Sequence, residues 1–135
     1  MFTPELHKFI NQAIDNQSIT ADDVKHLQSQ ILHSGIGSRQ EADALLALDR
    51  TLDTDPSWAE FLTAIMVDFV VWGSRPTGRV PAETAAWLVT AFTCGEPTGT
   101  AVRIARAIVA EAQEVDADLL LFAHRGTSAL VSLAA

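Results

Sequence analysis

The sequence contains a single cysteine, Cys94, and no tyrosine among its 135 residues. A disulfide within the chain needs two thiols, and a cysteine-based zinc site needs several thiols held close together. The cysteine content therefore excludes both kinds of cross-link. We expect the fold to be held by a hydrophobic core, which a chain of this length can form without a disulfide or a structural metal.

Basic residues are also scarce. The chain has 9 lysines and arginines against 17 aspartates and glutamates, which gives a formal net charge of −8. A surface with this charge repels phosphate backbones. We therefore expect no nucleic-acid partner. Basic proteins or cations fit this balance better, although acidity also commonly serves solubility alone.

Long hydrophobic runs are absent. The longest apolar stretch, 61–72, is interrupted by Thr63 and Asp68 and is too short to cross a bilayer. The N-terminus contains Glu5 and Lys8 and lacks the basic region and long apolar segment of a secretory signal. These features predict a cytoplasmic protein without a membrane span.

Strand-like alternation of apolar and polar residues is absent too, whereas alanine, leucine and helix-capping residues recur along the chain. The pattern predicts an all-α fold, a single compact bundle in one domain, 1–135. The helix at 55–72 is apolar on nearly all sides and is expected to be central. About seven helices are predicted, at roughly 4–16, 20–32, 39–52, 55–72, 81–93, 100–114 and 116–133.

Two similar phrases, 35–45 and 78–88, indicate an internal repeat. Each contains a glycine turn, one apolar residue, a helix-start signal and an amphipathic helix. We predict that the fold consists of two related helix-turn-helix halves, roughly 1–74 and 75–135. The glycine- and proline-containing connection at 73–78 would join them.

The segment 35–48 reads Gly-Ile-Gly-Ser-Arg-Gln-Glu-Ala-Asp-Ala-Leu-Leu-Ala-Leu, and Ser38 and Glu41 in it have the spacing of a capping box. This segment resembles the second helix-turn-helix of small bacterial proteins allied to the TerB-like tellurite-resistance group. The stretch 72–88 resembles the Gly-x-Val turn that opens the other half. The resemblance covers about half of the chain. It implies a small helical protein in which an Asp-Gly turn and an acidic cluster can hold a metal.

The sequence departs from that pattern where metal ligands would stand. Ser34 occupies the position of the turn aspartate, and Gly37 and Gln40 replace the apolar residue and the first glutamate. No twelve-residue window has the spacing that supplies calcium with its oxygens. We therefore expect no metal and no other cofactor. The alternative is a weak divalent-cation site formed by Asp15, Asp22, Asp23 and Glu41, although interaction with helix dipoles is the simpler role for the aspartates.

The histidines and the cysteine lack catalytic spacing. His26 and His33 lie two turns apart on one predicted helix, too far to share an ion without a third element. His7 and His124 are isolated. Cys94 has no histidine nearby in the sequence and is predicted to be a buried apolar side chain. We expect no enzymatic activity, and a histidine paired with Cys94 is the weaker alternative.

The tryptophans bear on function. Helical spacing favours the core for Trp58 and Trp72, whereas Trp87, next to Ala85 and Ala86, fits a core and a binding surface equally well. We predict a non-catalytic scaffold or adaptor that binds another protein through an apolar patch with an acidic rim. The predicted binding residues, on the turns of the two halves, are Arg39, Glu41, Arg79, Glu83 and Trp87.

Two questions stay open at the level of sequence. The apolar C-terminal segment 126–135 either docks on the core or contacts a second copy, which would give a homodimer. A stress-linked protein that uses the weak cation site is the alternative function.

Overall fold

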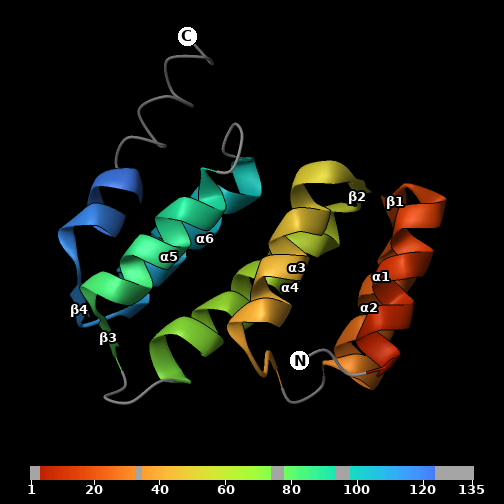
Figure 1. Cartoon of the computed structure of the whole chain (residues 1–135), viewed down its shortest axis with the longest axis horizontal. Coiled ribbons are helices and arrows are strands. Elements are labelled where there is room, and N and C mark those ends of the chain that lie inside the picture. Colours follow the sequence, from red (N-terminus) through yellow and green to blue (C-terminus); the bar gives the residue numbers. More distant parts are fainter. Residues whose placement is uncertain (1–3, 33–34, 74–77, 94–97, 124–135) are drawn as a thin grey trace, which may run out of the picture. The chain divides into compact units, whose positions relative to one another are not determined.

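The computed structural model describes residues 4–32, 35–73, 78–93 and 98–123. Helices dominate these ranges, and the strands in them are two-residue segments, so the predicted all-α fold class is confirmed. The elements in chain order (Figure 1) are α1 (Pro4–Asn16), β1 (Ser18–Ile19), α2 (Ala21–His26), the π-helix η1 (Leu27–Ile31), α3 (Arg39–Thr51), β2 (Asp53–Thr54), α4 (Pro56–Val67), the π-helix η2 (Asp68–Trp72), β3 (Arg79–Val80), α5 (Ala82–Phe92), α6 (Gly99–Glu111), β4 (Glu114–Val115) and a last described helix at 117–123.

Contacts divide the chain into two compact units, Met1–Ile65 and Met66–Ala135. The boundary falls inside the long helical stretch of α4 and η2, which the sequence predicts as central, and not in the 73–78 connection. Each unit contains fully buried large side chains, such as Trp58 in the first and Phe92 in the second.

In the first unit, a short parallel ladder joins two helical hairpins. Ser18 of β1 lies opposite Asp53 of β2, and Ile19 lies opposite Thr54. The Asp55 amide donates to the Ile19 carbonyl (2.9 Å) and extends the ladder by one hydrogen bond. The buried apolar side chains of this unit include Leu6, Phe9, Ala13, Ile19, Val24, Leu27, Leu45, Leu46, Trp58 and Leu62.

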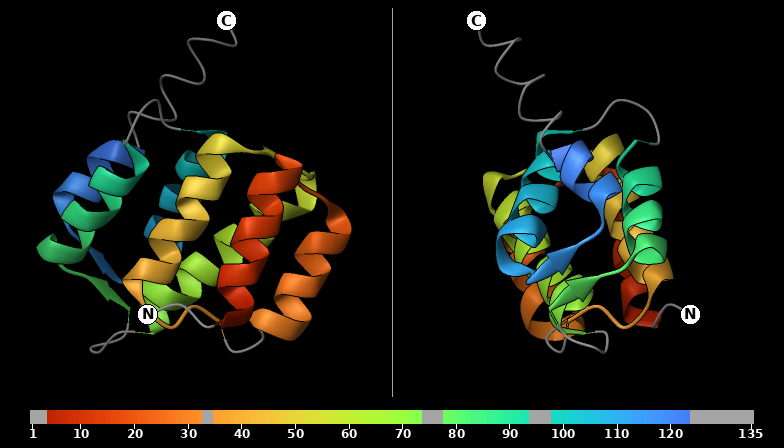
Figure 2. Two further views of the ribbon diagram at one scale, coloured as in Figure 1. Left: turned by 45° about the vertical axis from the view of Figure 1, so that its right-hand side comes forward. Right: turned by 90° about the vertical axis from the view of Figure 1, so that its left-hand side faces the viewer.

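The second unit has the same kind of ladder, with β3 and β4 side by side in Figure 2. Arg79 lies opposite Glu114, and Val80 opposite Val115. The Asp116 amide donates to the Val80 carbonyl (3.0 Å). The buried apolar side chains here include Val70, Val71, Val80, Ala85, Leu88, Phe92, Val102, Ile104, Ala105, Ile108 and Leu119.

The two ladders define an internal repeat. The register partners are residues 18 and 53 in one ladder and 79 and 114 in the other, so both pairs are 35 residues apart and the second follows the first by 61 residues. The predicted relation between two halves therefore has a structural counterpart. Its register differs from the prediction, because Gly78 leads into a strand and corresponds to Gln17, whereas the phrase at 35–45 leads straight into α3.

Helix caps explain where several helices begin. Thr20 forms a complete capping box: its hydroxyl accepts from the Asp23 amide (3.2 Å), and the Asp23 carboxylate accepts from the Thr20 amide (3.0 Å). Ser38 accepts from the Glu41 amide (3.3 Å). Of the box predicted at Ser38 and Glu41, the structure shows the serine half.

An aspartate cap begins α4. The Asp55 carboxylate accepts from the Ser57 hydroxyl (2.6 Å) and the Ser57 amide (3.0 Å). These two hydrogen bonds, the hydroxyl's first, hold the pKa of Asp55 below its ordinary value. The cap is followed by Trp58, whose ring is fully buried while its indole nitrogen donates to Asp49 (3.1 Å).

The predicted core position of Trp72 is wrong, because this residue is 44% exposed. Two other large apolar residues, Ile14 (53%) and Leu120 (43%), are exposed as well. Ile14 lies in the last turn of α1, beyond the buried Ala13. Trp72 ends η2, whose wider π-helical turn shifts residues away from the 3.6-residue pattern used for the prediction. Leu120 faces outward because its neighbour Leu119 points into the core.

The backbone before each first strand provides a paired test of the repeat. Gly78 (φ 81°) and Gln17 (φ 57°) both adopt left-handed conformations. Gly78→Ala should destabilise the protein by about 1–2 kcal/mol, because an L-residue is strained there. A Cβ at Gly78 would meet Gln113 at an ordinary 3.5 Å, so the cost is conformational. Gln17→Gly should leave the stability of the protein nearly unchanged or raise it by up to about 1 kcal/mol. Glycine relieves the strain of the left-handed conformation in the folded state, but it also increases the conformational entropy of the unfolded chain, and the two effects oppose each other. Urea unfolding measures both, and a neutral Gly78→Ala would contradict the equivalence.

The Asp55 cap should make the stability of the protein depend on pH. Ser57→Ala removes the larger cause of the lowered pKa, so the pKa of Asp55 should rise toward its unfolded value. Because the folded pKa is the lower one, ionised Asp55 stabilises the protein above the unfolded pKa, and this stabilisation is lost as pH falls through the folded pKa. The destabilisation by Ser57→Ala should therefore be largest near neutral pH and shrink in acid.

Urea unfolding across a pH series, with an NMR titration of Asp55, measures this effect. Ser29→Ala is the matched control, because the Ser29 hydroxyl donates to the Lys25 main-chain carbonyl. A Ser57→Ala effect as independent of pH as that of the control would refute the role of the cap.

Candidate functional site

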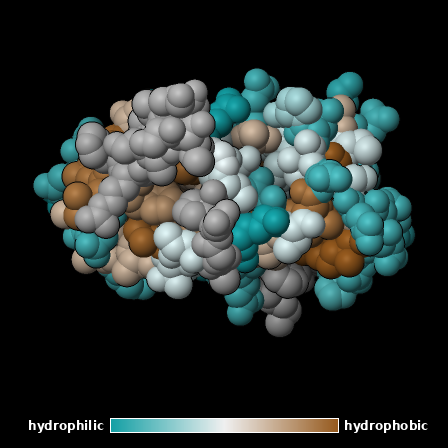
Figure 3. Space-filling model, turned by 90° about the horizontal axis from the view of Figure 1, so that it is seen from above, coloured by the Kyte–Doolittle hydropathy of each residue, from teal (hydrophilic) through white to brown (hydrophobic). Residues whose placement is uncertain are grey.

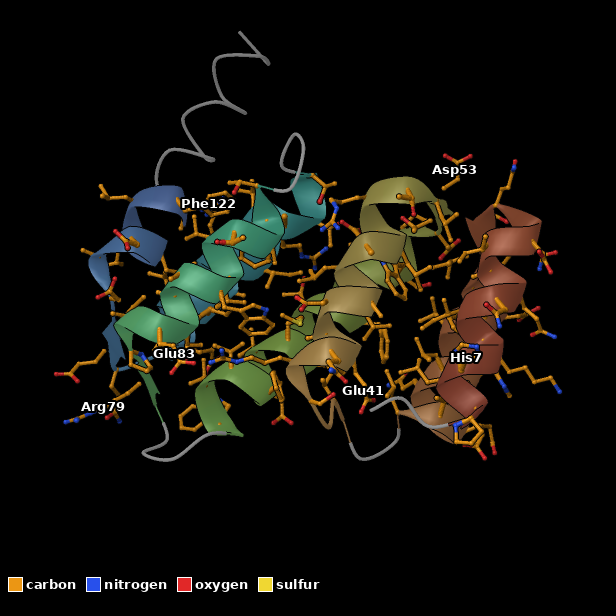
Figure 4. All side chains as sticks on the ribbon, in the orientation of Figure 1. His7, Glu41, Asp53, Arg79, Glu83 and Phe122 are labelled. Carbon is orange, nitrogen blue, oxygen red and sulfur yellow. The ribbon has the colours of Figure 1, made fainter. Side chains whose placement is uncertain are left out.

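Glu41 lies in the first turn of α3, after the N-cap Ser38, and is labelled in Figure 4. It is 6% exposed and is the only buried polar or charged side chain in the described part of the chain. A Cβ built on Gly37 would lie 2.8 Å from the Glu41 Oε1 atom, so the carboxylate lies against the backbone of that glycine. Glu41 was predicted to bind a partner at the surface. Its burial contradicts that placement.

The second unit shows that the helix start does not need this carboxylate. Thr98 caps α6 by accepting from the Ala101 amide (3.0 Å), so Ala101 occupies the helical position that Glu41 has in α3. Both residues are buried. The positive end of the α3 dipole favours a carboxylate at this point. Glu41 is therefore a feature of the first unit that goes beyond the requirements of capping.

The four carboxylates of the alternative cation site have different surroundings in the structure. Asp15 and Asp22 are exposed, Asp23 completes the capping box with Thr20, and Glu41 is buried. Within the described ranges, no group of three or more histidine, cysteine, aspartate or glutamate side chains could hold a metal ion. His33, Cys94 and the segment 126–135 lie outside the described residues.

Arg79 and Glu83 lie at the entrance to α5 in the second unit. The Arg79 Nε atom is 3.0 Å from Glu114 Oε2, across the β3–β4 ladder, and both side chains are more than half exposed. Such an exposed pair adds little stability. Glu83 is exposed in the first turn of α5. Figure 4 shows Arg79 extending outward from β3.

Trp87 is half-buried, one turn after Glu83. Its ring packs edge-on against Phe69 of η2, with centroids 6.2 Å apart and an interplanar angle of 80°. Trp72 follows Phe69 by three residues and is the exposed tryptophan noted above. We use the name aromatic surface for the contacting pair Phe69 and Trp87 together with the exposed Trp72 of the same π-helix.

Exposed acidic residues accompany both tryptophans of the aromatic surface. Asp68 precedes Trp72 by four residues on η2, and Glu83 precedes Trp87 by four residues on α5. Residues four apart on a helix lie on nearly the same side. Each tryptophan therefore has a carboxylate one turn away. Of the predicted binding residues, the second unit holds Arg79, Glu83 and Trp87, and the first unit holds Arg39 and Glu41.

Sequence reasoning missed the exposed leucines of the last described helix, Leu120 and Leu121. A signal for them was present, because three consecutive leucines, 119–121, span too wide an arc of a helix for all to face one core. Trp72 had no comparable signal, since nothing in the residue pattern announces a π-helical turn.

No protein-family model, curated protein or solved structure matches this chain. The resemblance to the TerB-like group therefore stays a prediction. Among the described residues, no helix is both long enough and apolar enough to span a membrane.

The contact between Gly37 and Glu41 can be tested with a double-mutant cycle. Gly37→Ala should destabilise the protein by about 1 kcal/mol, because the new methyl group displaces a buried carboxylate from its place. In a Glu41→Ala background the same substitution should be neutral or stabilising, since glycine removal restricts the unfolded chain. Urea unfolding of the four proteins gives the coupling energy. Additive effects would show that the two residues do not interact.

Proposed function

We propose that this protein is a non-catalytic scaffold or adaptor that binds another protein through the aromatic surface of its second unit. The observation that supports this proposal is the exposure of Trp72, 44% of whose surface is accessible. Tryptophan is among the residues most enriched at the energetic centres of protein interfaces. A large exposed ring also gains free energy when a partner removes it from water.

The charges around the aromatic surface support a protein partner of complementary sign. Asp68 and Glu83 supply the acidic rim, within a chain of net charge −8. Carboxylates at the edge of an interface steer association and select partners more than they add affinity. We therefore expect lysine or arginine at the edge of the partner's surface. Arg79, already paired with Glu114, would contribute specificity at the same end of α5.

The proposal retains part of the site expected from the sequence. The proposed binding site contains Trp87, Glu83 and Arg79, which were predicted from the sequence, and also Trp72. The buried Glu41 is no longer part of the site. Arg39 belongs to the first unit and is not needed for this surface. A cytoplasmic location remains part of the proposal, and a second copy of the chain is the alternative partner.

Affinity capture with matched variants tests the proposal. Immobilised wild-type protein should retain at least one partner from a lysate of its native source, and Trp72→Ser should reduce that retention about tenfold. Ile14→Ser is the control, because Ile14 is exposed to a similar degree in the first unit. Quantitative mass spectrometry compares the three retained sets, and urea unfolding confirms that each variant is folded.

Two outcomes would refute the proposal. Identical retention by wild type and Trp72→Ser would exclude the aromatic surface as the binding site. Retention of the chain itself, with a dimer in sedimentation that Trp72→Ser dissociates, would make the surface a self-association contact.

A further inference from the structure

The helix at 117–123, the blue helix that follows β4 in Figure 1, exposes a second apolar surface. Leu119 and Ala123 are buried and define its inward side. Leu120 and Leu121 are 43% and 51% exposed on the other side. At 3.6 residues per turn, the exposed Asp118 lies beside Leu121. We call Leu120, Leu121 and Asp118 the leucine face.

The internal repeat shows that the fold does not require these leucines. A displacement of 61 residues relates the two ladders, and it places Leu119 at the position of Trp58, both fully buried. The same displacement places Leu120 and Leu121 at the positions of Ala59 and Glu60, and Glu60 is exposed. The first unit thus builds an equivalent helix with a small residue and a charged one. The exposed leucines are an addition specific to the second unit.

Carboxylates dominate the stretch of chain that leads into the leucine face. Glu111, Glu114, Asp116 and Asp118 fall within eight residues, and no lysine or arginine occurs between Arg106 and Arg125. Within the described part of the chain, Glu114 is the only one of these four carboxylates that forms an ion pair, with Arg79. A second copy on a two-fold axis would bring identical carboxylates together. The charge therefore favours a basic occupant over a second copy.

We propose that the leucine face binds a basic amphipathic helix of a partner protein. Apolar side chains spaced three or four residues apart on that helix would cover Leu120 and Leu121, and its lysines or arginines would pair with Asp118 and the carboxylates that precede it. In Figure 3, exposed hydrophobic areas lie among hydrophilic residues. This inference adds a second binding surface and does not depend on the aromatic surface.

The test uses a fluorescein-labelled synthetic helix of leucine and lysine, with a scrambled peptide of the same composition as control. Binding is measured by fluorescence anisotropy. The key variant is L120A/L121E, which installs the residues of the first unit and adds one negative charge. We expect saturable binding to wild type and at least about tenfold weaker binding to L120A/L121E, because the apolar contact is lost. Asp118→Asn should weaken binding severalfold and reduce its dependence on salt.

The added charge makes the outcome decisive, since capture of a basic peptide by charge alone would be as tight or tighter in L120A/L121E. Urea unfolding checks that the variant folds, and Asp118→Asn provides the second variant if it does not. Trp72→Ser should bind the peptide normally, which separates this inference from the function proposed above.

Four binding results would overturn the inference, and so would one result on oligomeric state. The binding results are no binding to wild type, equal binding of the scrambled peptide, equal binding to L120A/L121E, or binding that requires removal of residues 127–135. The last result would identify the chain's own C-terminal segment as the occupant. A wild-type dimer that L120A/L121E converts to monomer would identify a second copy, and would equally refute the proposal.

Discussion

The short parallel ladders are the constraint on which each unit depends. Two paired residues and one extra hydrogen bond, from Asp55 to Ile19 in one unit and from Asp116 to Val80 in the other, join segments that lie 35 residues apart. The strands are too short to form a sheet with its own core. Their effect is to fix where the following helices begin. A buried Ile19 or Val80 in each ladder couples this register to the hydrophobic core, so a shift by one residue would expose an apolar side chain.

Much of the helical structure could be predicted because local signals and tertiary structure agree. The caps at Thr20 and Ser38 and the apolar spacing of Leu45 and Leu48 all favour the observed helices. The strands could not be predicted, because two residues are too few to show an alternation of apolar and polar side chains. Their pairing is a long-range contact, and it decides which left-handed backbone positions of the two units are equivalent. For that reason the sequence pairs Gly78 with Gly35, whereas the fold pairs it with Gln17.

The candidate site was predicted less well than the fold, for identifiable physical reasons. Glu83 follows regular α-helical spacing, so its exposure on α5 could be anticipated, whereas the spacing of Trp87 fits the core and the surface equally well and the residue is half-buried. The exposure of Trp72 could not be anticipated, because the hydrogen-bonding pattern of η2 widens from i+4 to i+5 and rotates the ring outward. The predicted surface position of Glu41 was wrong for another reason. Its sequence pattern, Ser-x-x-Glu, predicts a carboxylate that turns back to the cap, while Gly37 leaves space that lets it pack inward.

A comparison of the two repeated units separates residues that the fold requires from residues that it does not require. Positions that match in both units, such as Trp58 and Leu119, are buried and satisfy the same core requirement. A position that differs in kind, Glu60 against Leu121, is free of that requirement, because both residues are exposed and each unit folds with a different residue there. A leucine at an exposed position lowers solubility and, when the related unit has glutamate, it gains nothing for the core. The proposed binding gives Leu121 a role that the stability of the core does not, and the same reasoning applies to any other exposed apolar residue whose repeat partner is charged.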